Sequence, residues 1–255
     1  MLLAIDIGNS NIVIGCIRDD VILFDARIAT DRARTSDQYG VEILQILDAN
    51  NVQKTDITGC IISSVVPPVF NYVRDGVIQY FGVRPMVVGP GLKTGLDIRV
   101  VQSEVGSDRI VIAVAALSKY EAPLLLIDMG TAITIEAVEP GRVYAGGVIM
   151  PGVITALDAL TGKTAQLPGI SLDTPDRVIG KSTVECMRSG VMYGAASMID
   201  GMIDRMQEEM GHTAKLIATG GVAPYIIPLC RHDIEINDDL LLQGLNILYN
   251  KNKKQ

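Results

Sequence analysis

The sequence has no tryptophan and only three phenylalanines among its 255 residues, and it has no basic excess. Lysine and arginine number 22 against 29 acidic residues, a net charge of −7, which argues against a nucleic-acid-binding surface. No apolar run reaches the ~18 residues that a membrane span needs. Asp6 interrupts the N-terminal apolar run and no basic segment precedes it, so we do not expect a signal peptide. We therefore expect a soluble protein with no nucleic-acid or membrane partner.

Paired cysteines are also missing. The four cysteines, Cys16, Cys60, Cys186 and Cys230, are widely spaced and form no CxxC motif. Two of them, Cys16 and Cys60, lie inside apolar strand-like runs, so buried reduced thiols are expected rather than a zinc site or a redox pair. A reducing, cytoplasmic compartment agrees with this pattern.

Several familiar catalytic motifs are absent: GxGxxG, GxSxG and HExxH do not occur. Gly162-Lys163-Thr164 and Gly180-Lys181-Ser182 resemble the end of a Walker A loop. That loop needs a further glycine five residues earlier, where the chain has Leu157 and Pro175. A P-loop enzyme, a dinucleotide enzyme, a serine hydrolase and a zinc hydrolase are thereby disfavoured.

What is present is an internal duplication. Residues 2–11, LLAIDIGNSN, match residues 124–133, LLLIDMGTAI: an apolar run, an aspartate, an apolar residue, a glycine and a small polar turn. Two more apolar runs follow each turn, at 12–17 and 21–28 and again at 134–138 and 143–150. Short apolar runs bounded by turn residues predict buried strands joined as hairpins.

Helical periodicity follows each predicted three-strand opening. The sequence predicts two βββαβα units in an α/β protein with a cleft between two similar domains, 1–118 and 119–255. Ser36 or Asp37 is the expected cap of the first helix. Helices are expected near 36–50, 67–80, 107–117, 182–210 and 238–249, with strands near 59–66, 85–88 and 216–218. We expect the lysines at 251, 253 and 254 to lie in a solvated tail.

The duplicated Asp-x-Gly turns carry the first chemical prediction. Glycine allows close backbone approach, and the N–H groups of such a turn can bind phosphate oxygens. The carboxylates of Asp6 and Asp128 would repel phosphate but can hold Mg²⁺ or its waters. Two such turns on facing domains would bind a nucleoside triphosphate. A plain hairpin turn is the alternative for either turn taken alone.

The start of the helix near residue 107 carries the second prediction. Asp108 is favoured there by the positive helix end, so a capping role is one interpretation. Arg109 opposes the dipole and favours an anionic partner, such as a ligand carboxylate. Asp108 could act as a general base for a hydroxyl in phosphoryl transfer. Glycine-rich junctions at 146–152 and 218–221 are further points of close approach.

Taken together, these motifs resemble those of the type III pantothenate kinases, members of the acetate kinase, sugar kinase and actin-like superfamily. The resemblance implies two RNase H-like, actin-like ATPase domains and ATP-dependent phosphorylation of pantothenate to 4′-phosphopantothenate, the first step of coenzyme A biosynthesis. It runs from Asp6 to about Gly221 and rests on the motifs at 6–11, 106–109, 128–132, 146–152, 180–183 and 218–221.

The resemblance also implies residue roles. Asp108 takes the catalytic-base position, Asp6 holds Mg²⁺, and Asp128 lies at a monovalent-cation site for K⁺ or NH₄⁺. Thr183 contacts substrate near the interface of a homodimer. The implied ATP-binding residues are Asp6, Ile7, Gly8, Asn9, Ser10, Asn11, Ile12, Val13 and Thr131, and the implied pantothenate-binding residues are Gly106, Ser107, Asp108, Arg109 and Thr183.

The sequence departs from the family pattern at Ser107, where an alanine is usual, at Lys163, where an arginine is common, and over one segment. Residues 100–103 lack the tyrosine and the Asp-Asn-Pro turn that are common there, so the acceptor pocket is expected to differ. Two alternatives follow: a kinase of the same fold for another small hydroxy acid, and a non-catalytic regulatory homologue. Retention of Asp6, Asp108 and Thr131 together favours catalysis.

Overall fold

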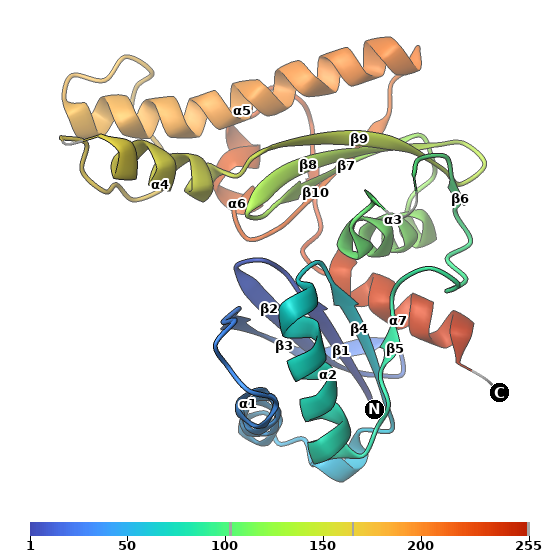
Figure 1. The fold of residues 1–255 in the computed structure, drawn as a ribbon. Coiled ribbons are helices and arrows are strands. Elements are labelled where there is room, and N and C mark those ends of the chain that lie inside the picture. Colours follow the sequence, from blue (N-terminus) through green and yellow to red (C-terminus); the bar gives the residue numbers. More distant parts are fainter. Residues whose placement is uncertain (102–103, 165, 254–255) are drawn as a thin grey trace. The chain divides into compact units, whose positions relative to one another are not determined.

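The chain folds into two compact units, each built on one sheet (Figure 1). The computed structural model describes residues 1–101, 104–164 and 166–253. Unit 1 comprises Met1–Leu96, Val100–Lys119 and Asp239–Gln255, and unit 2 comprises Asp97–Arg99 and Tyr120–Asp238. The last segment thus belongs to unit 1, whereas we expected it in a second domain that continued to residue 255.

The sheet of unit 1 has the strand order β3-β2-β1-β4-β5. The central strand β1 pairs antiparallel with β2 and parallel with β4. Its residues are buried throughout, as expected of an apolar run in the middle of a sheet. The strands are β1 (Leu2–Ile7), β2 (Asn11–Arg18), β3 (Val21–Ala29), β4 (Gly59–Ser64) and β5 (Met86–Val87).

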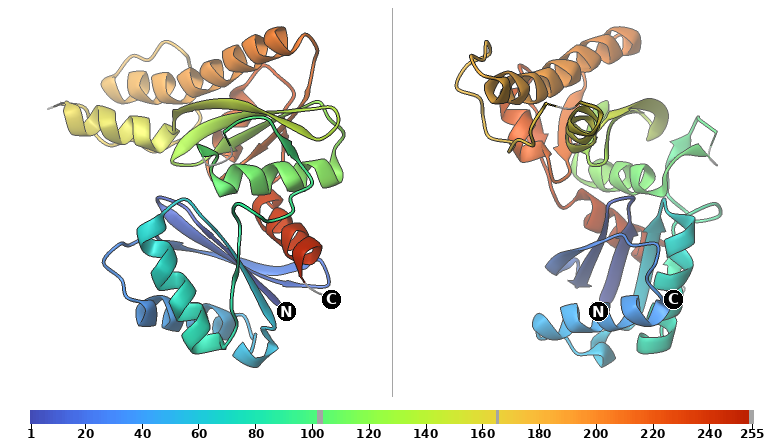
Figure 2. Two further views of the ribbon diagram at one scale, coloured as in Figure 1. Left: turned by 45° about the vertical axis from the view of Figure 1, so that its right-hand side comes forward. Right: turned by 60° about the vertical axis from the view of Figure 1, so that its left-hand side comes forward.

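Helices cover both faces of this sheet. Alternate residues of β1 contribute to two separate cores, because successive side chains of a strand point to opposite faces. Leu3, Ile5 and Ile7 pack with α1 (Ser36–Ala49) and α2 (Pro67–Phe81), and these two helices contact each other (Figure 2).

The other face of the same sheet packs on α3 (Ser107–Lys119) and α7 (Leu240–Asn252). Leu2 and Ala4 of β1 share a core there with Leu245 of α7. Asp6 follows Ala4 by two residues in β1, so its side chain lies on the same face of the sheet, the face that α3 covers.

Unit 2 repeats the arrangement of unit 1. Its strand order is β11-β10-β7-β8-β9-β6, so β9-β8-β7-β10-β11 reproduces the order of unit 1. The expected duplication is therefore visible in the strand order. Its strands are β7 (Leu124–Met129), β8 (Ala132–Glu139), β9 (Val143–Pro151), β10 (Lys215–Thr219) and β11 (Glu235–Ile236), with β6 (Asp97–Ile98) added parallel to β9.

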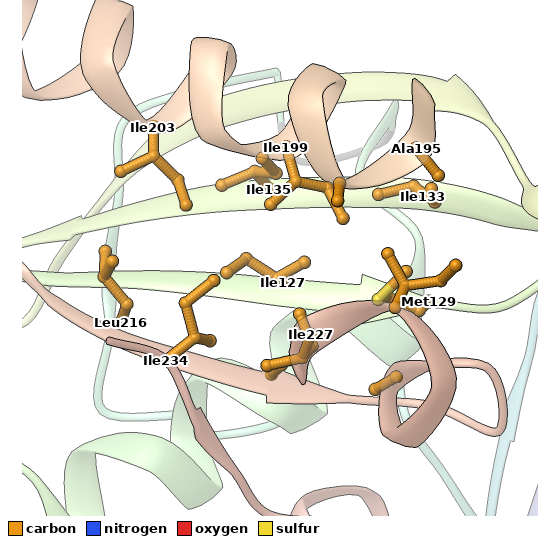
Figure 3. Packing of buried hydrophobic residues seen from close by; sticks show 14 of the residues in the cluster. Ile127, Met129, Ile133, Ile135, Ala195, Ile199, Ile203, Leu216, Ile227 and Ile234 are labelled. Atoms are coloured by element: carbon orange, nitrogen blue, oxygen red, sulfur yellow. The ribbon is translucent and has the colours of Figure 1, made fainter. Parts of the chain in front are cut away.

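A long helix, α5, packs its apolar side chains into the core of unit 2. Figure 3 shows Ala195, Ile199 and Ile203 of α5 (Thr183–Met210) against Ile133 and Ile135 of β8. Burial of each isoleucine side chain stabilises the unit by about 1.5–3 kcal/mol relative to exposure. The remaining elements are α4 (Val153–Lys163), α6 (Ala223–Ile226) and the 3₁₀ turns η1 (Lys54–Asp56) and η3 (Ile227–Leu229).

Some local predictions were wrong. The cap of α1 is Thr35 rather than Ser36 or Asp37, because Thr35 and Gln38 form a reciprocal capping box. Lys251 is exposed as expected, but it lies within α7 rather than in a tail, and its Nζ donates to the Thr94 carbonyl at 3.1 Å. Lys253 follows the helix and is exposed, as expected. Lys254 lies outside the described residues.

The cysteines carry no disulfide in the described part of the chain, where all four are free thiols. Cys16 and Cys60 are buried as expected, whereas Cys186 is exposed and Cys230 is partly buried. Burial raises the pKa of the Cys60 thiol and raises the pKa of Cys230 to about 12, which leaves both thiols protonated at neutral pH. Within the described ranges, no helix is both long and apolar enough to cross a membrane.

Candidate active site

The turn between β1 and β2 is held by backbone and side-chain hydrogen bonds. The Gly8 N–H donates to the Asn11 carbonyl at 3.0 Å, and the Thr30 hydroxyl donates to the Gly8 carbonyl at 2.6 Å. Asp6, 7% exposed, is the last but one residue of the buried strand β1, just before this turn, and Asn9 and Ser10 are exposed at its tip. A fixed turn with exposed polar groups beside a carboxylate is suited to phosphate and its metal ion.

The strand next to β1 supplies a polar pair at the same edge. Ser63 of β4 lies opposite Asp6 in the parallel register, and Ser64 lies opposite Ile7. Ser63 is completely buried, and its Oγ is 2.8 Å from the Oγ of Ser107. Hydroxyls therefore connect the strand that pairs with β1 to the first turn of α3.

Asp108 follows in that first turn. Its Oδ1 accepts a hydrogen bond from the Arg109 backbone N–H at 2.9 Å. Gly106 lies against the same carboxylate: a Cβ on Gly106 would come within 2.4 Å of Asp108 Oδ1. The glycine predicted here thus leaves room for the aspartate side chain, which occupies the space beside it.

Burial governs the acidity of Asp108. Desolvation raises the pKa of its carboxyl above the ordinary value, and the Arg109 N–H and guanidinium only partly oppose this. A raised pKa makes the ionised carboxylate a stronger proton acceptor. The capping interpretation accounts for the backbone hydrogen bond, but a helix-capping role alone would not favour burial of the charge.

Unit 2 has a corresponding turn between β7 and β8. The Gly130 N–H donates to the Ala132 carbonyl at 3.0 Å. This acceptor is two residues along the chain, whereas the acceptor of the Gly8 N–H, Asn11, is three residues along. The Thr131 carbonyl accepts from the Gly152 N–H at 3.2 Å and from the Thr155 hydroxyl at 2.7 Å. Thr131 itself is exposed at the tip of the turn.

The surroundings of Asp128 repeat those of Asp6. Asp128 lies opposite Thr219 of the parallel strand β10, as Asp6 lies opposite Ser63. Gly220 follows Thr219 with φ +99°, and a Cβ on it would come within 2.8 Å of Asp128 Oδ1. The glycine-rich junction predicted at 218–221 therefore makes room for the Asp128 carboxylate.

Thr183 lies in another part of unit 2, at the start of α5. Ser182 caps this helix by accepting the Glu185 N–H at 3.3 Å, and Thr183 is exposed. The Gly180-Lys181-Ser182 segment therefore acts locally as a helix start. Within unit 1 the structure brings Asp6 near the 106–109 segment through Ser63, and within unit 2 it brings Asp128 and Thr131 together at one turn.

A metal site made by protein carboxylates alone is not found in the described residues, which contain no group of three or more His, Cys, Asp or Glu arranged for a metal. Asp6 and Asp128 are single carboxylates at strand ends. Mg²⁺ is commonly held by one or two carboxylates with water and substrate phosphates, so Asp6 with its neighbouring turn fits that donor set.

Some contributing residues were missed by the sequence analysis. Ser63 and Ser64 end a buried strand, and Thr30 follows β3 and holds the Gly8 turn. The polar Ser63-Ser64 pair directly after the apolar run Cys60–Ile62 was the available signal, because fully buried hydroxyls need a partner. Residues 102 and 103 of the divergent acceptor segment lie outside the described residues.

Comparison with known proteins agrees with these features. The family model for type III pantothenate kinase matches residues 2–205. A protein of Exiguobacterium sp. strain AT1b, named type III pantothenate kinase, is 45% identical over 255 residues, covering 100% of both chains.

Two solved structures resemble the fold at low sequence identity. A Sinorhizobium meliloti protein described as a 2-dehydro-3-deoxygalactonokinase has a TM-score of 0.59 at 10% identity, covering 100% of this chain and 98% of that one. A Campylobacter jejuni protein described as a conserved Baf family transcriptional activator has a TM-score of 0.61 at 19% identity, covering 98% of each chain. The predicted fold, an α/β protein with two RNase H-like domains, is confirmed. With the family match over most of its length, the chain belongs to the type III pantothenate kinase family.

Proposed function

We propose that Asp108 is the general base of this kinase, which phosphorylates pantothenate with ATP in coenzyme A biosynthesis. In this role Asp108 accepts the proton of the pantothenate hydroxyl. The hydroxyl oxygen forms a bond to the γ-phosphorus, the bond from that phosphorus to the bridging oxygen of ADP breaks, and the hydroxyl proton passes to the Asp108 carboxylate. The observation that carries this role is the placement of a partly buried carboxylate with a raised pKa in the first turn of α3.

The phosphate side of the reaction is assigned to the two Asp-x-Gly turns. In unit 1, residues 6–13 bind the ATP phosphates and Asp6 holds Mg²⁺, which neutralises phosphate charge when bound. In unit 2, Thr131 contacts ATP and Asp128 holds a monovalent cation, K⁺ or NH₄⁺. The fixed backbone bonds of both turns support these roles, because donors held in place need no reorganisation during the reaction.

The acceptor is assigned to Gly106, Ser107, Asp108 and Arg109 of unit 1 together with Thr183. The Arg109 guanidinium would bind the pantothenate carboxylate by paired charged hydrogen bonds. Thr183 is exposed in the described chain, which supports its contribution at an interface between two copies in a homodimer. We also place the enzyme in the cytoplasm, where ATP is available and its four free thiols would stay reduced.

The base assignment is tested by Asp108→Asn. We expect kcat for 4′-phosphopantothenate formation to fall by about 10²- to 10⁴-fold, the usual contribution of a positioned base. The KM for ATP should change little, because the phosphate turns are untouched. Asp75→Asn is the matched control, since Asp75 is an exposed aspartate of unit 1 paired with Arg74. An unchanged kcat for Asp108→Asn would rule out the base role.

The cation assignment has a separate test. Wild-type protein should phosphorylate pantothenate faster with potassium than without it, and Asp128→Asn should remove this difference. Product should be followed directly as phosphorylated pantothenate. A rate independent of potassium in the wild type would contradict the cation site. Phosphorylation of another hydroxy acid in preference to pantothenate would instead indicate that the divergent segment 100–103 has redirected the acceptor pocket.

A further inference from the structure

The hydroxyl of Ser107 is fully used in hydrogen bonding, although the residue lies in the proposed acceptor segment. Its Oγ donates to the Ser64 carbonyl at 3.1 Å and accepts the Ser64 N–H at 3.1 Å. The remaining contact, to Ser63 Oγ at 2.8 Å, therefore receives its hydrogen from Ser63. One donor and two acceptor positions are thus all occupied, which is the complete capacity of a hydroxyl.

These bonds connect two parts of unit 1 that are distant in sequence. Ser63 and Ser64 end β4, and Ser107 begins α3, 44 residues beyond Ser63. β4 is in turn fixed in parallel register to β1, with Ser63 opposite Asp6. The Ser107 side chain therefore links the first turn of α3 to β4, the strand that lies next to Asp6.

The position of Asp108 depends on that turn. It is the residue directly after Ser107, and its carboxylate lies against Gly106, where a Cβ would come within 2.4 Å of Oδ1. The same hypothetical Cβ would lie 3.3 Å from Val65, the residue after Ser64. Any shift of the α3 start away from β4 would move the Asp108 carboxylate and admit water beside it.

We propose that Ser107 and its buried partner Ser63 are positioning residues that set the place of Asp108 relative to Asp6. The proposal rests on the base role of Asp108 and gives the Ser107 hydroxyl a contact with the protein backbone, in addition to the place of Ser107 in the acceptor segment. Positioning matters because a misplacement of about 1 Å in a reacting group can lower a rate by about 10²-fold.

The first test is Ser107→Ala, with Ser118→Ala as the matched control. Ser118 lies near the other end of the same helix, is exposed, and its Oγ bonds only locally to the Ala115 carbonyl at 2.7 Å. Ser107→Ala should lower kcat by about tenfold, within the range for a misplaced group, and leave the KM for ATP within twofold. The acidic limb of the kcat profile should move to lower pH, because a loosened Asp108 gains water. Ser118→Ala should change neither.

The partner provides a graded second test. Ser63→Ala removes one of the three Ser107 contacts and should lower kcat less than Ser107→Ala does. The double variant should be no slower than Ser107→Ala, since both changes break one connection. This comparison also keeps the proposal testable if Ser107→Ala folds poorly. A double variant whose loss equals the product of the two single losses would overturn the proposal.

The Asp108→Asn background separates this inference from the base assignment. If Ser107 acts through Asp108, adding Ser107→Ala to Asp108→Asn should cause no further loss of kcat. An equal loss in both backgrounds, or a wild-type rate for Ser107→Ala, would exclude the positioning role and leave the base role standing. An unchanged rate for Asp108→Asn alone would instead exclude the base role, and the positioning role with it.

Discussion

The two units have the same strand order, but the helices α3 and α7, which follow their last strands, differ in the residues of their first turns. After β5, α3 begins with Gly106-Ser107-Asp108-Arg109 and presents a partly buried carboxylate in its first turn. After β11, α7 buries apolar residues in the core of unit 1, among them Leu242, Leu245 and Leu248. Both helices pack in the same core of unit 1, to which α3 contributes Val111 and Val114, but only α3 has an acidic residue in its first turn.

The turns differ in a similar way. The β1–β2 turn is one residue longer than the β7–β8 turn, and Thr30 holds it by a side-chain hydroxyl. In unit 2, Gly152 occupies the corresponding place after β9 and approaches the turn through its backbone. Each turn thus receives one backbone N–H and one hydroxyl bond. Thr30 supplies both in unit 1, whereas Gly152 and Thr155 supply one each in unit 2.

The largest expected effect on stability concerns α7. Leu245→Ala should lower the free energy of unfolding by about 2–5 kcal/mol, as other buried leucine truncations do. Leu245 is fully buried in the core between α7 and the sheet of unit 1. Urea denaturation measures the loss, with Leu241→Ala, a less buried leucine of α7, as the control. A loss below about 1 kcal/mol would mean that α7 contributes little to unit 1.

A pair of glycine substitutions compares the turns directly. Gly152→Ala should destabilise by about 1–3 kcal/mol, because its Cβ would come within 2.3 Å of the Thr131 carbonyl oxygen and 2.5 Å of the Gly130 oxygen. Gly8→Ala should cost less, since its Cβ would lie 3.0 Å from the Asn11 oxygen. Thermal unfolding of both variants checks the order. Equal losses would show that the turn of unit 2 gives way as readily as that of unit 1.

A smaller effect is expected at the end of α7. The Asn252 side chain accepts the Lys93 N–H at 2.9 Å and donates to the Lys93 carbonyl at 3.0 Å. Asn252→Ala should lower stability by about 0.5–1.5 kcal/mol, the net value of a typical hydrogen bond, because the site is exposed to water. Gln243→Ala on the same helix is the control. Chemical denaturation of the pair gives the difference, and no difference would show that α7 does not tie down the 93–95 segment.

The smallest expected effect is a gain in stability at Asp108. Burial raises the folded-state pKa of this carboxyl, so its favourable contribution is present below its unfolded pKa of about 3.9 and is lost as pH rises through the folded pKa. Asp108→Asn should therefore unfold at a slightly higher temperature than wild type at neutral pH. The difference should disappear in acid, below the unfolded pKa.

Ionisation of Asp108, which lowers the stability of the folded protein, should raise its turnover. The base must be ionised, so kcat of the wild type should fall as pH decreases through the pKa of Asp108, at a higher pH than for an ordinary aspartate. Melting curves and rates over one pH series test both consequences. An Asp108→Asn protein less stable than wild type at neutral pH would contradict a raised pKa.

Much of the fold could be predicted from local sequence. The repeated apolar-Asp-x-Gly pattern at 2–11 and 124–133 predicted two hairpin openings, and the structure has β1–β2 and β7–β8 there. Helices α1, α2, α3 and α5 begin within one residue of the expected positions, since each start carries a capping residue, proline or an acidic first turn. The two-residue β6 was missed because so short a segment has no periodicity.

By itself the sequence determined the succession of strands and helices in two βββαβα units, the turn residues and the family, because these depend on patterns of neighbouring residues. Tertiary structure alone decided that the last helix stabilises unit 1, since the choice between cores depends on contacts formed far along the chain. It also decided the environment of Asp108: burial, the space left by Gly106 and the Ser63–Ser107 hydroxyl pair exist only once β4 and α3 are packed together. The physical reason is that desolvation and hydrogen-bond partners are properties of a place in the folded chain, and residue identity fixes only which groups can respond to that place.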